Sequence, residues 1–288
     1  MLPPTHENKK KPMLSKDAPN ESILSQTVLK ALDVLECVAN ADQPLSAQQV
    51  AKALKISRPT AYRLLSTLVS RGYVAEGDGA RFRLGTQALS LSNKVLASID
   101  LPDVARSYMR QLSDLTNETV NLSIREGTEI IYIARVESSQ SIRMMSTIGT
   151  RSHLHSTSMG KAVLAFLPGE EQTLLIERLA FTPRTTETIT ERALLVKELA
   201  NVRKQGFAID NEENEAGVRC VGAPIFDHTG YAFAAISISG PAYRLSVARL
   251  KALAHPLIEA THAISAHLGH VPARPTPAVS VQKFSGGN

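Results

Sequence analysis

The sequence predicts an α+β protein built from a helical N-terminal third and a longer region of alternating helices and strands. From about residue 22 to residue 99, apolar residues recur at helical spacing, with one short hairpin pattern between them. The next region, up to residue 270, contains strand-like runs at 119–125, 129–136, 217–227 and 231–240. The length of 288 residues is enough for two domains that each bury a core.

The two ends of the chain are predicted to be disordered tails. Residues 1–21 contain four prolines and a lysine run, and residues 271–288 contain three prolines and a glycine pair. With only two cysteines, Cys37 and Cys220, a disulfide framework and a multi-cysteine zinc site are excluded. No apolar run approaches the ~20 residues of a membrane span, and no apolar stretch follows the N-terminal lysines. We therefore expect a soluble, cytoplasmic protein.

The N-terminal third shows the signals of two short helices joined by a tight turn. Ser46 and Gln49 form a capping-box pattern at the start of a helix that ends near Leu54. Ser57 caps the next helix, and Pro59 falls in its first turn, where a missing N–H costs little. A longer helix precedes both, with one apolar stripe formed by Val28, Ala31, Leu32, Leu35, Val38 and Ala39.

Two capped helices this close together match the DNA-binding helix-turn-helix. The second helix exposes Arg58, Thr60 and Arg63 near its N-terminal end, which is the end that enters the major groove. Arginine can pair with guanine through two hydrogen bonds, and threonine can contact a base edge or a thymine methyl. These three residues are therefore candidates for base readout.

A β-hairpin over residues 73–84 follows the second helix and contains a Gly-Asp-Gly turn. Strand alternation places Phe82 and Leu84 on one face and turns Arg81 and Arg83 outward. Such a wing is placed to contact phosphate or the minor groove.

The charge distribution supports a polyanion partner for this part of the chain. The net charge is +5, and residues 1–100 hold 13 Lys and Arg against 9 Asp and Glu, so most of the excess lies there. The alternative is a helical interaction module whose arginines are only solvated. We predict DNA contacts from Lys55, Ser57, Arg58, Thr60, Arg63, Arg81 and Arg83.

The second region indicates a small polar pocket. Ser237 and Ser239 lie two apart in an otherwise apolar strand, so both hydroxyls face one side. A buried hydroxyl without a partner costs ~1–3 kcal/mol, so this pair needs backbone, water or ligand partners. A Ser-Thr-Ser run at 156–158 precedes a helical segment at 159–167, and a helix N-terminus favours an anion. Together these features suit a carboxylate or a polyol acid.

Three blocks of the sequence resemble IclR-type bacterial transcriptional regulators. Residues 45–73 resemble the N-terminal domain of that family, and residues 217–241 resemble its C-terminal signature. A third block at 155–165 lies between them, and the resemblance spans about residues 22–270 in the family's order. It is therefore more specific than a helix-turn-helix alone.

The resemblance implies a ligand-responsive regulator that binds operator DNA as a dimer or a dimer of dimers. A single ~80-residue module also buries too little surface for a selective site, which favours a dimer on a pseudo-palindrome. The implied parts are a winged helix-turn-helix at 22–85, a linker helix at 86–99, and a GAF-like antiparallel-sheet effector domain at 100–270. The implied effector-site residues are Asp210, Cys220, Ser237, Ser239, Ser158 and Met159, with Met144 and Ser152 as the variable wall.

Other interpretations of the second region stay open from sequence. The serines could be structural, Cys220 could be a small buried hydrophobe, and Met144 could fill the core. A catalytic set of Cys220, His155 and Asp210 is conceivable, but no nucleophile elbow or glycine-rich oxyanion loop flanks the cysteine. The domain could also serve oligomerisation alone. We expect neither enzymatic activity, nor a cofactor, nor a bound metal.

Overall fold

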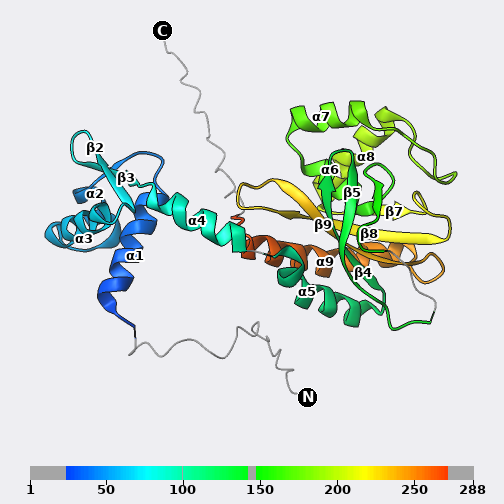
Figure 1. Ribbon diagram of the computed structural model, residues 1–288, viewed down its shortest axis with the longest axis horizontal. Helices are drawn as coiled ribbons and strands as arrows, with labels where there is room; N and C mark the ends of the chain where they lie inside the picture. The colour runs from blue at the N-terminus through cyan, green and yellow to red at the C-terminus, as the bar shows by residue number, and fades with distance from the viewer. Residues whose placement is uncertain (1–23, 99, 142–146, 272–288) are drawn as a thin grey trace, which may run out of the picture. The chain divides into compact units, whose positions relative to one another are not determined.

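The computed structural model describes residues 24–98, 100–141 and 147–271. Met144 and, apart from Val271, both predicted tails lie outside the described residues. The chain divides into two compact units, residues 1–98 and 99–288, and each is described by itself (Figure 1). Within the described residues, no helix is long and apolar enough to cross a membrane.

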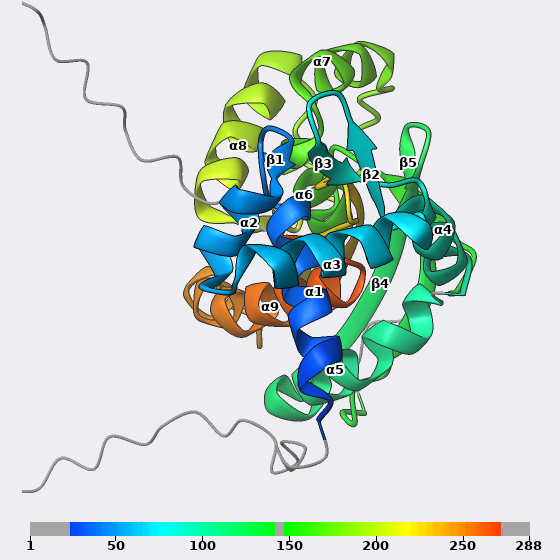
Figure 2. The same cartoon turned by 90° about the vertical axis from the view of Figure 1, so that its left-hand side faces the viewer.

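The first unit packs three helices against a small sheet, and a fourth helix follows. The sheet has the strand order β1-β3-β2. Helices α2 and α3 contact each other directly (Figure 2). The elements are α1 (Gln26–Ala39), β1 (Leu45–Ser46), α2 (Ala47–Leu54), α3 (Arg58–Ser70), β2 (Val74–Gly77), β3 (Arg81–Leu84) and α4 (Gln87–Ser98).

The helix starts of this unit confirm the predicted caps. The Ser46 hydroxyl accepts from the Gln49 amide at 3.3 Å, and the Gln49 side chain accepts from the Ser46 amide at 2.9 Å. Lys55 takes a left-handed conformation that ends α2, and Ser57 caps α3 by accepting from the Thr60 amide. The turn between the two helices is therefore set by local chemistry.

The apolar stripe of α1 is divided between two faces. Val34 and Val38 are buried in the core of the unit, whereas Val28 is 56% exposed and Leu32 is 49% exposed. Of the predicted stripe, Ala31, Leu35 and Val38 pack in the core, and the prediction was wrong for the Val28 and Leu32 edge, because the core of this small unit covers only one side of the helix.

The wing differs from the prediction in two details. Gly77 pairs with Arg81 in the ladder, so the turn lies at residues 78–80 and Ala80 takes a positive φ of 52°. Phe82 is 1% exposed, but Leu84 is 40% exposed although alternation puts both on one face. The third strand, β1, pairs only with Arg81 and Phe82, so Leu84 lies beyond its cover.

The second unit is a six-stranded antiparallel sheet with helices on both faces, which confirms the predicted α+β class with an antiparallel C-terminal sheet. Its strand order is β6-β5-β4-β9-β8-β7. The strands are β4 (Thr119–Glu126), β5 (Glu129–Val136), β6 (Arg151–His153), β7 (Ala208–Asn211), β8 (Val218–Phe226) and β9 (Ala232–Pro241). The helices are α5 (Leu101–Thr116), α6 (Ser158–Phe166), α7 (Gly169–Arg178), α8 (Arg192–Gln205) and α9 (Val247–His267).

The two sheet faces carry separate hydrophobic cores. Helices α5 and α9 cover one face, and α6, α7 and α8 cover the other (Figure 1). Ile236 and Ile238 of β9 belong to the core under α5 and α9. Ser237 and Ser239 therefore point to the α6 side, where strand alternation predicts them.

Strand β8 passes close to the start of α6 at Gly222. A Cβ atom on this glycine would lie 2.7 Å from the carbonyl carbon of Ser158 and 2.9 Å from the amide nitrogen of Met159. Both contacts are with backbone, which cannot rotate away. The glycine thus allows the helix start to lie directly on the strand.

We predict that Gly222→Ala destabilises the second unit by about 1–3 kcal/mol, because the helix start must shift. Urea unfolding of the full chain, followed by circular dichroism, measures the change. Gly169→Ala is the matched control, since a Cβ atom there meets no atom within 4 Å. An unchanged unfolding midpoint for Gly222→Ala would contradict the close approach.

Candidate functional site

Five of the seven predicted DNA-contacting residues lie just before α3 or in its first two turns. Arg58, Arg63 and Lys55 are exposed. The hydroxyls of Ser57 and Thr60 lie 2.8 Å apart, so they partner each other at the cap. Tyr62 is also exposed on α3. Tyr62 is thus an aromatic candidate for contact with DNA. The signal for it in the sequence is its position outside the apolar stripe of the helix.

The two arginines of the wing differ in their surroundings. The Arg81 guanidinium donates to the carbonyl oxygen of Pro44 at 3.1 Å, which ties the wing to the residue before β1. Arg83 is exposed. Arg81 therefore stabilises the wing in addition to any contact that it makes with DNA. Among the described residues, the Arg83 side chain has no comparable hydrogen bond.

A cavity of about 280 Å³ lies on the α6 side of the large sheet. Seven of the eight predicted pocket residues line it: Ser152, Ser158, Met159, Asp210, Cys220, Ser237 and Ser239. The eighth, Met144, lies outside the described residues. Thr157, from the predicted Ser-Thr-Ser run, also lines the cavity. The lining residues that the sequence analysis did not identify are Asn121, Tyr132, Thr147, Thr150, Arg151, Arg184, Asn214, Glu215 and Val218.

The floor of the cavity is made by the polar faces of β4 and β9. The hydroxyls of Ser237 and Ser239 lie 3.2 Å apart, and the Asn121 amide donates to Ser239 at 3.3 Å. These serines thus have side-chain partners and also line the cavity. Thr119, Asn121 and Ser123 alternate along β4 with buried apolar residues, which is the same signal that identified the serines.

The start of α6 forms one wall. The Thr157 hydroxyl caps the helix by accepting from the Gly160 amide at 3.0 Å. Ser158 and Met159 are the first two helical residues, and helix geometry gives their amides no intrahelical acceptor. Both residues line the cavity, so this wall is suited to an anionic group.

Asp210 is buried beside this wall. One of its carboxyl oxygens accepts from the amides of Glu213, at 2.8 Å, and Asn214, at 3.3 Å. Burial, with a smaller contribution from the neighbouring Glu213 carboxylate, raises the pKa of Asp210 to about 7 against the opposing effect of Lys161. Near neutral pH much of this group is uncharged, so it does not exclude an anionic ligand.

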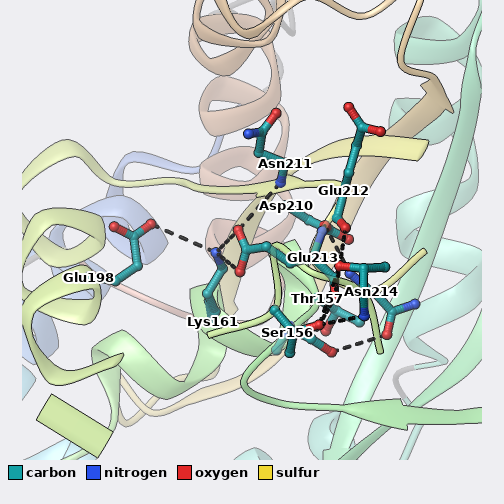
Figure 3. Close-up of polar contacts among 12 residues, drawn as sticks. Ser156, Thr157, Lys161, Glu198, Asp210, Asn211, Glu212, Glu213 and Asn214 are labelled. Carbon is teal, nitrogen blue, oxygen red and sulfur yellow. Dashed lines mark hydrogen bonds and ion pairs between the residues drawn. The ribbon is translucent and has the colours of Figure 1, made fainter. Parts of the chain in front are cut away.

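Lys161 connects α6 to the loop between β7 and β8 (Figure 3). Its ammonium is fully buried and lies 2.6 and 2.7 Å from the two carboxylate oxygens of Glu213. Glu198 of α8 lies 3.8 Å away. In the same loop, the Asn214 side chain accepts from Ser156 at 3.1 Å. Sequence motifs gave Lys161 no role, and the structure shows that it holds the cavity wall together.

The residues of the conceivable catalytic set are not arranged for catalysis. Burial raises the pKa of the Cys220 thiol well above its ordinary value, and Asp210 raises it further, so the thiolate is disfavoured. His155 is not among the cavity-lining residues. One of its ring nitrogens lies 3.3 Å from the carbonyl oxygen of Thr182, and its ring packs near Phe181.

We predict that Asp210 makes the stability of the second unit depend on pH. Its pKa is about 7 in the folded chain against an ordinary 3.8, so its contribution is complete below about pH 4 and is lost as pH rises through about 7. The free energy of unfolding of the wild type should fall by about 2–4 kcal/mol relative to Asp210→Asn between about pH 4 and pH 8. Urea unfolding across that range measures it, and parallel curves for both proteins would contradict the raised pKa.

Comparisons with known proteins match both units. The family described as "Bacterial transcriptional regulator IclR C-terminal" matches residues 93–266, and the "IclR helix-turn-helix domain" matches residues 27–78. The chain is 36% identical to the transcriptional regulator KdgR of Escherichia coli, covering 85% of this chain and 93% of that protein. It is 37% identical to BhcR of Paracoccus denitrificans, covering 82% and 85%.

Solved structures give the same result. The IclR protein of Thermotoga maritima is 35% identical, with a TM-score of 0.58 over 85% of this chain and 99% of that one. The Agrobacterium tumefaciens repressor BlcR is 28% identical, with a TM-score of 0.71 over 85% and 98%.

Proposed function

The chain belongs to the IclR family of bacterial transcriptional regulators, and we propose that a small organic acid bound in its cavity controls its affinity for operator DNA. The observation that supports the effector part is the cavity itself, which is lined by seven of the predicted residues, among them Ser158 and Met159 at the start of α6. The relatives are named as regulators and not as enzymes. A bacterial regulator works where the chromosome lies, so we place it in the cytoplasm.

In this proposal α3 reads the operator and the wing positions the domain. Arg58 and Arg63 are exposed and have the donor geometry that pairs with guanine. Arg83 and Lys55 add phosphate contacts, which supply most of the affinity and make it sensitive to salt. Ser57 and Thr60 hold the start of the helix and present their hydroxyls beside it.

We propose that the protein acts as a dimer or a dimer of dimers. Val28 and Leu32 lie one turn apart on the outward face of α1 and are about half exposed, and Leu24 just before the helix is 37% exposed. An apolar strip of this kind on a small unit is suited to pairing with a second copy. Pairing also supplies the second half-site contact that a single module lacks.

Effector control can reach the DNA-binding unit through β4 and α5. Asn121 of β4 bonds Ser239 at the cavity floor. Glu118 lies three residues earlier, between α5 and β4, and is buried. Its carboxylate accepts two hydrogen bonds from Arg244, at 2.8 and 2.9 Å. Helix α5 continues the chain from α4, which ends at Ser98. Linkage then requires that DNA change the effector affinity by the same factor.

We predict that Arg63→Ala costs ~1–3 kcal/mol of binding at one base pair of the operator and relaxes specificity there. Fluorescence anisotropy on the DNA upstream of the protein's own gene, with single-base variants and a salt series, measures this. Arg71→Ala is the control, because Arg71 is exposed at the opposite end of the same helix. If cognate and mismatched sites weaken equally, Arg63 contacts phosphate instead.

The double variant Ser237→Ala with Ser239→Ala is expected to lose the effector response and to keep DNA binding, because its changes are confined to the cavity floor. Release of labelled DNA by a panel of organic acids measures the response, and thermal unfolding checks the fold. Ser107→Ala, on the exposed side of α5, is the control. Loss of folding in the double variant would support a purely structural role for the serines.

A further inference from the structure

The rim of the cavity carries one arginine whose charge is not compensated. Arg184 is exposed, lines the cavity, and makes no ion pair or side-chain hydrogen bond with any residue that the structure describes. The other lining arginine, Arg151, differs, because it pairs with both Glu126 and Glu129. Among the lining residues that the structure describes, Arg184 is therefore the cation that remains available to a ligand.

The backbone of Arg184 is fixed relative to the cavity. Its amide donates to the Thr188 hydroxyl at 3.0 Å, and Thr188 is buried. That hydroxyl donates to the Glu213 carbonyl at 2.6 Å, and the Thr185 hydroxyl donates to the Glu212 carbonyl at 2.7 Å. The segment that carries Arg184 is thus tied to the loop that carries Asn214 and Glu215 of the cavity wall.

The cavity consequently has two places that favour negative charge. One is the start of α6, where the Ser158 and Met159 amides lie, and the other is Arg184 at the rim. A volume of about 280 Å³ exceeds what a two-carbon acid fills, since one water takes ~30 Å³. Since Ser158, Met159 and Arg184 line one cavity, we take a longer molecule as the kind of ligand that contacts both places.

We infer that the effector is a dianion whose carboxylate binds at the start of α6 and whose second anionic group binds Arg184. This inference rests on the proposed function, because it specifies the class of acid that the same cavity takes. The carboxylate of Glu215, which also lines the cavity, repels the second anionic group and weakens its binding. The preference for dianions over monocarboxylates therefore comes from Arg184.

Isothermal titration of the full chain with straight-chain acids tests this. The probes are dicarboxylates from malonate to adipate, each paired with the monocarboxylate of the same chain length. We expect at least one dicarboxylate to bind at least tenfold more tightly than its partner. Arg184→Gln should remove that advantage and leave monocarboxylate binding unchanged, whereas Glu215→Gln should increase dicarboxylate affinity. Arg178→Gln, an exposed arginine of α7 outside the cavity lining, is the control.

The possible failures are distinguishable. Equal binding of both acid classes, or an equal loss for both in Arg184→Gln, overturns the dianion inference and leaves the organic-acid effector in place. No binding of any acid to the wild type overturns the inference together with the proposed effector class. Dicarboxylate selectivity that Arg184→Gln does not alter shows that another group reads the second charge, and it overturns the role of Arg184.

Discussion

The ion pair between Lys161 and Glu213 is the interaction on which the cavity depends. A fully buried ammonium without a partner costs several kcal/mol, so Glu213 must stay against α6. The backbone of Glu213 then fixes two neighbours, because its amide donates to Asp210 and its carbonyl accepts from Thr188. One buried pair therefore holds the helix start against the β7–β8 loop (Figure 3). Through Thr188 it also holds the segment that carries Arg184.

The same pair sets the electrostatics of the cavity. Lys161 lowers the pKa of Asp210, yet its charge is already matched by Glu213, whose carboxylate raises the pKa of Asp210. Burial and this repulsion outweigh the attraction, so the pKa of the carboxyl rises to about 7 and the group is mostly protonated below that pH. The uncharged carboxyl is therefore compatible with the organic-acid ligand that we propose for this cavity.

The sequence predicted the features that depend on neighbouring residues. The Ser46 and Ser57 caps follow local rules, and the alternation of Ser237 and Ser239 follows strand geometry, so all were found. Arg184 and the other loop residues of the cavity were not found, because their positions are set by contacts with segments far along the chain. The outward face of α1 was misassigned for a related reason, since periodicity identifies apolar residues but not which of them a small core covers.

The construction of β9 explains how the cavity can act on the rest of the domain. Its serines line the cavity, while Ile236 and Ile238, on the opposite face, pack in the core under α5 and α9. A close-packed core does not absorb displacement gradually, so a ligand that moves the serines must also move the isoleucines or pay for strain. The core that receives this movement includes Leu101 and Ala105 at the start of α5, immediately after the chain leaves the DNA-binding unit. In the mechanism that we propose, β9 therefore transmits a displacement at the cavity to the core under α5, in addition to the connection through β4, Glu118 and Arg244.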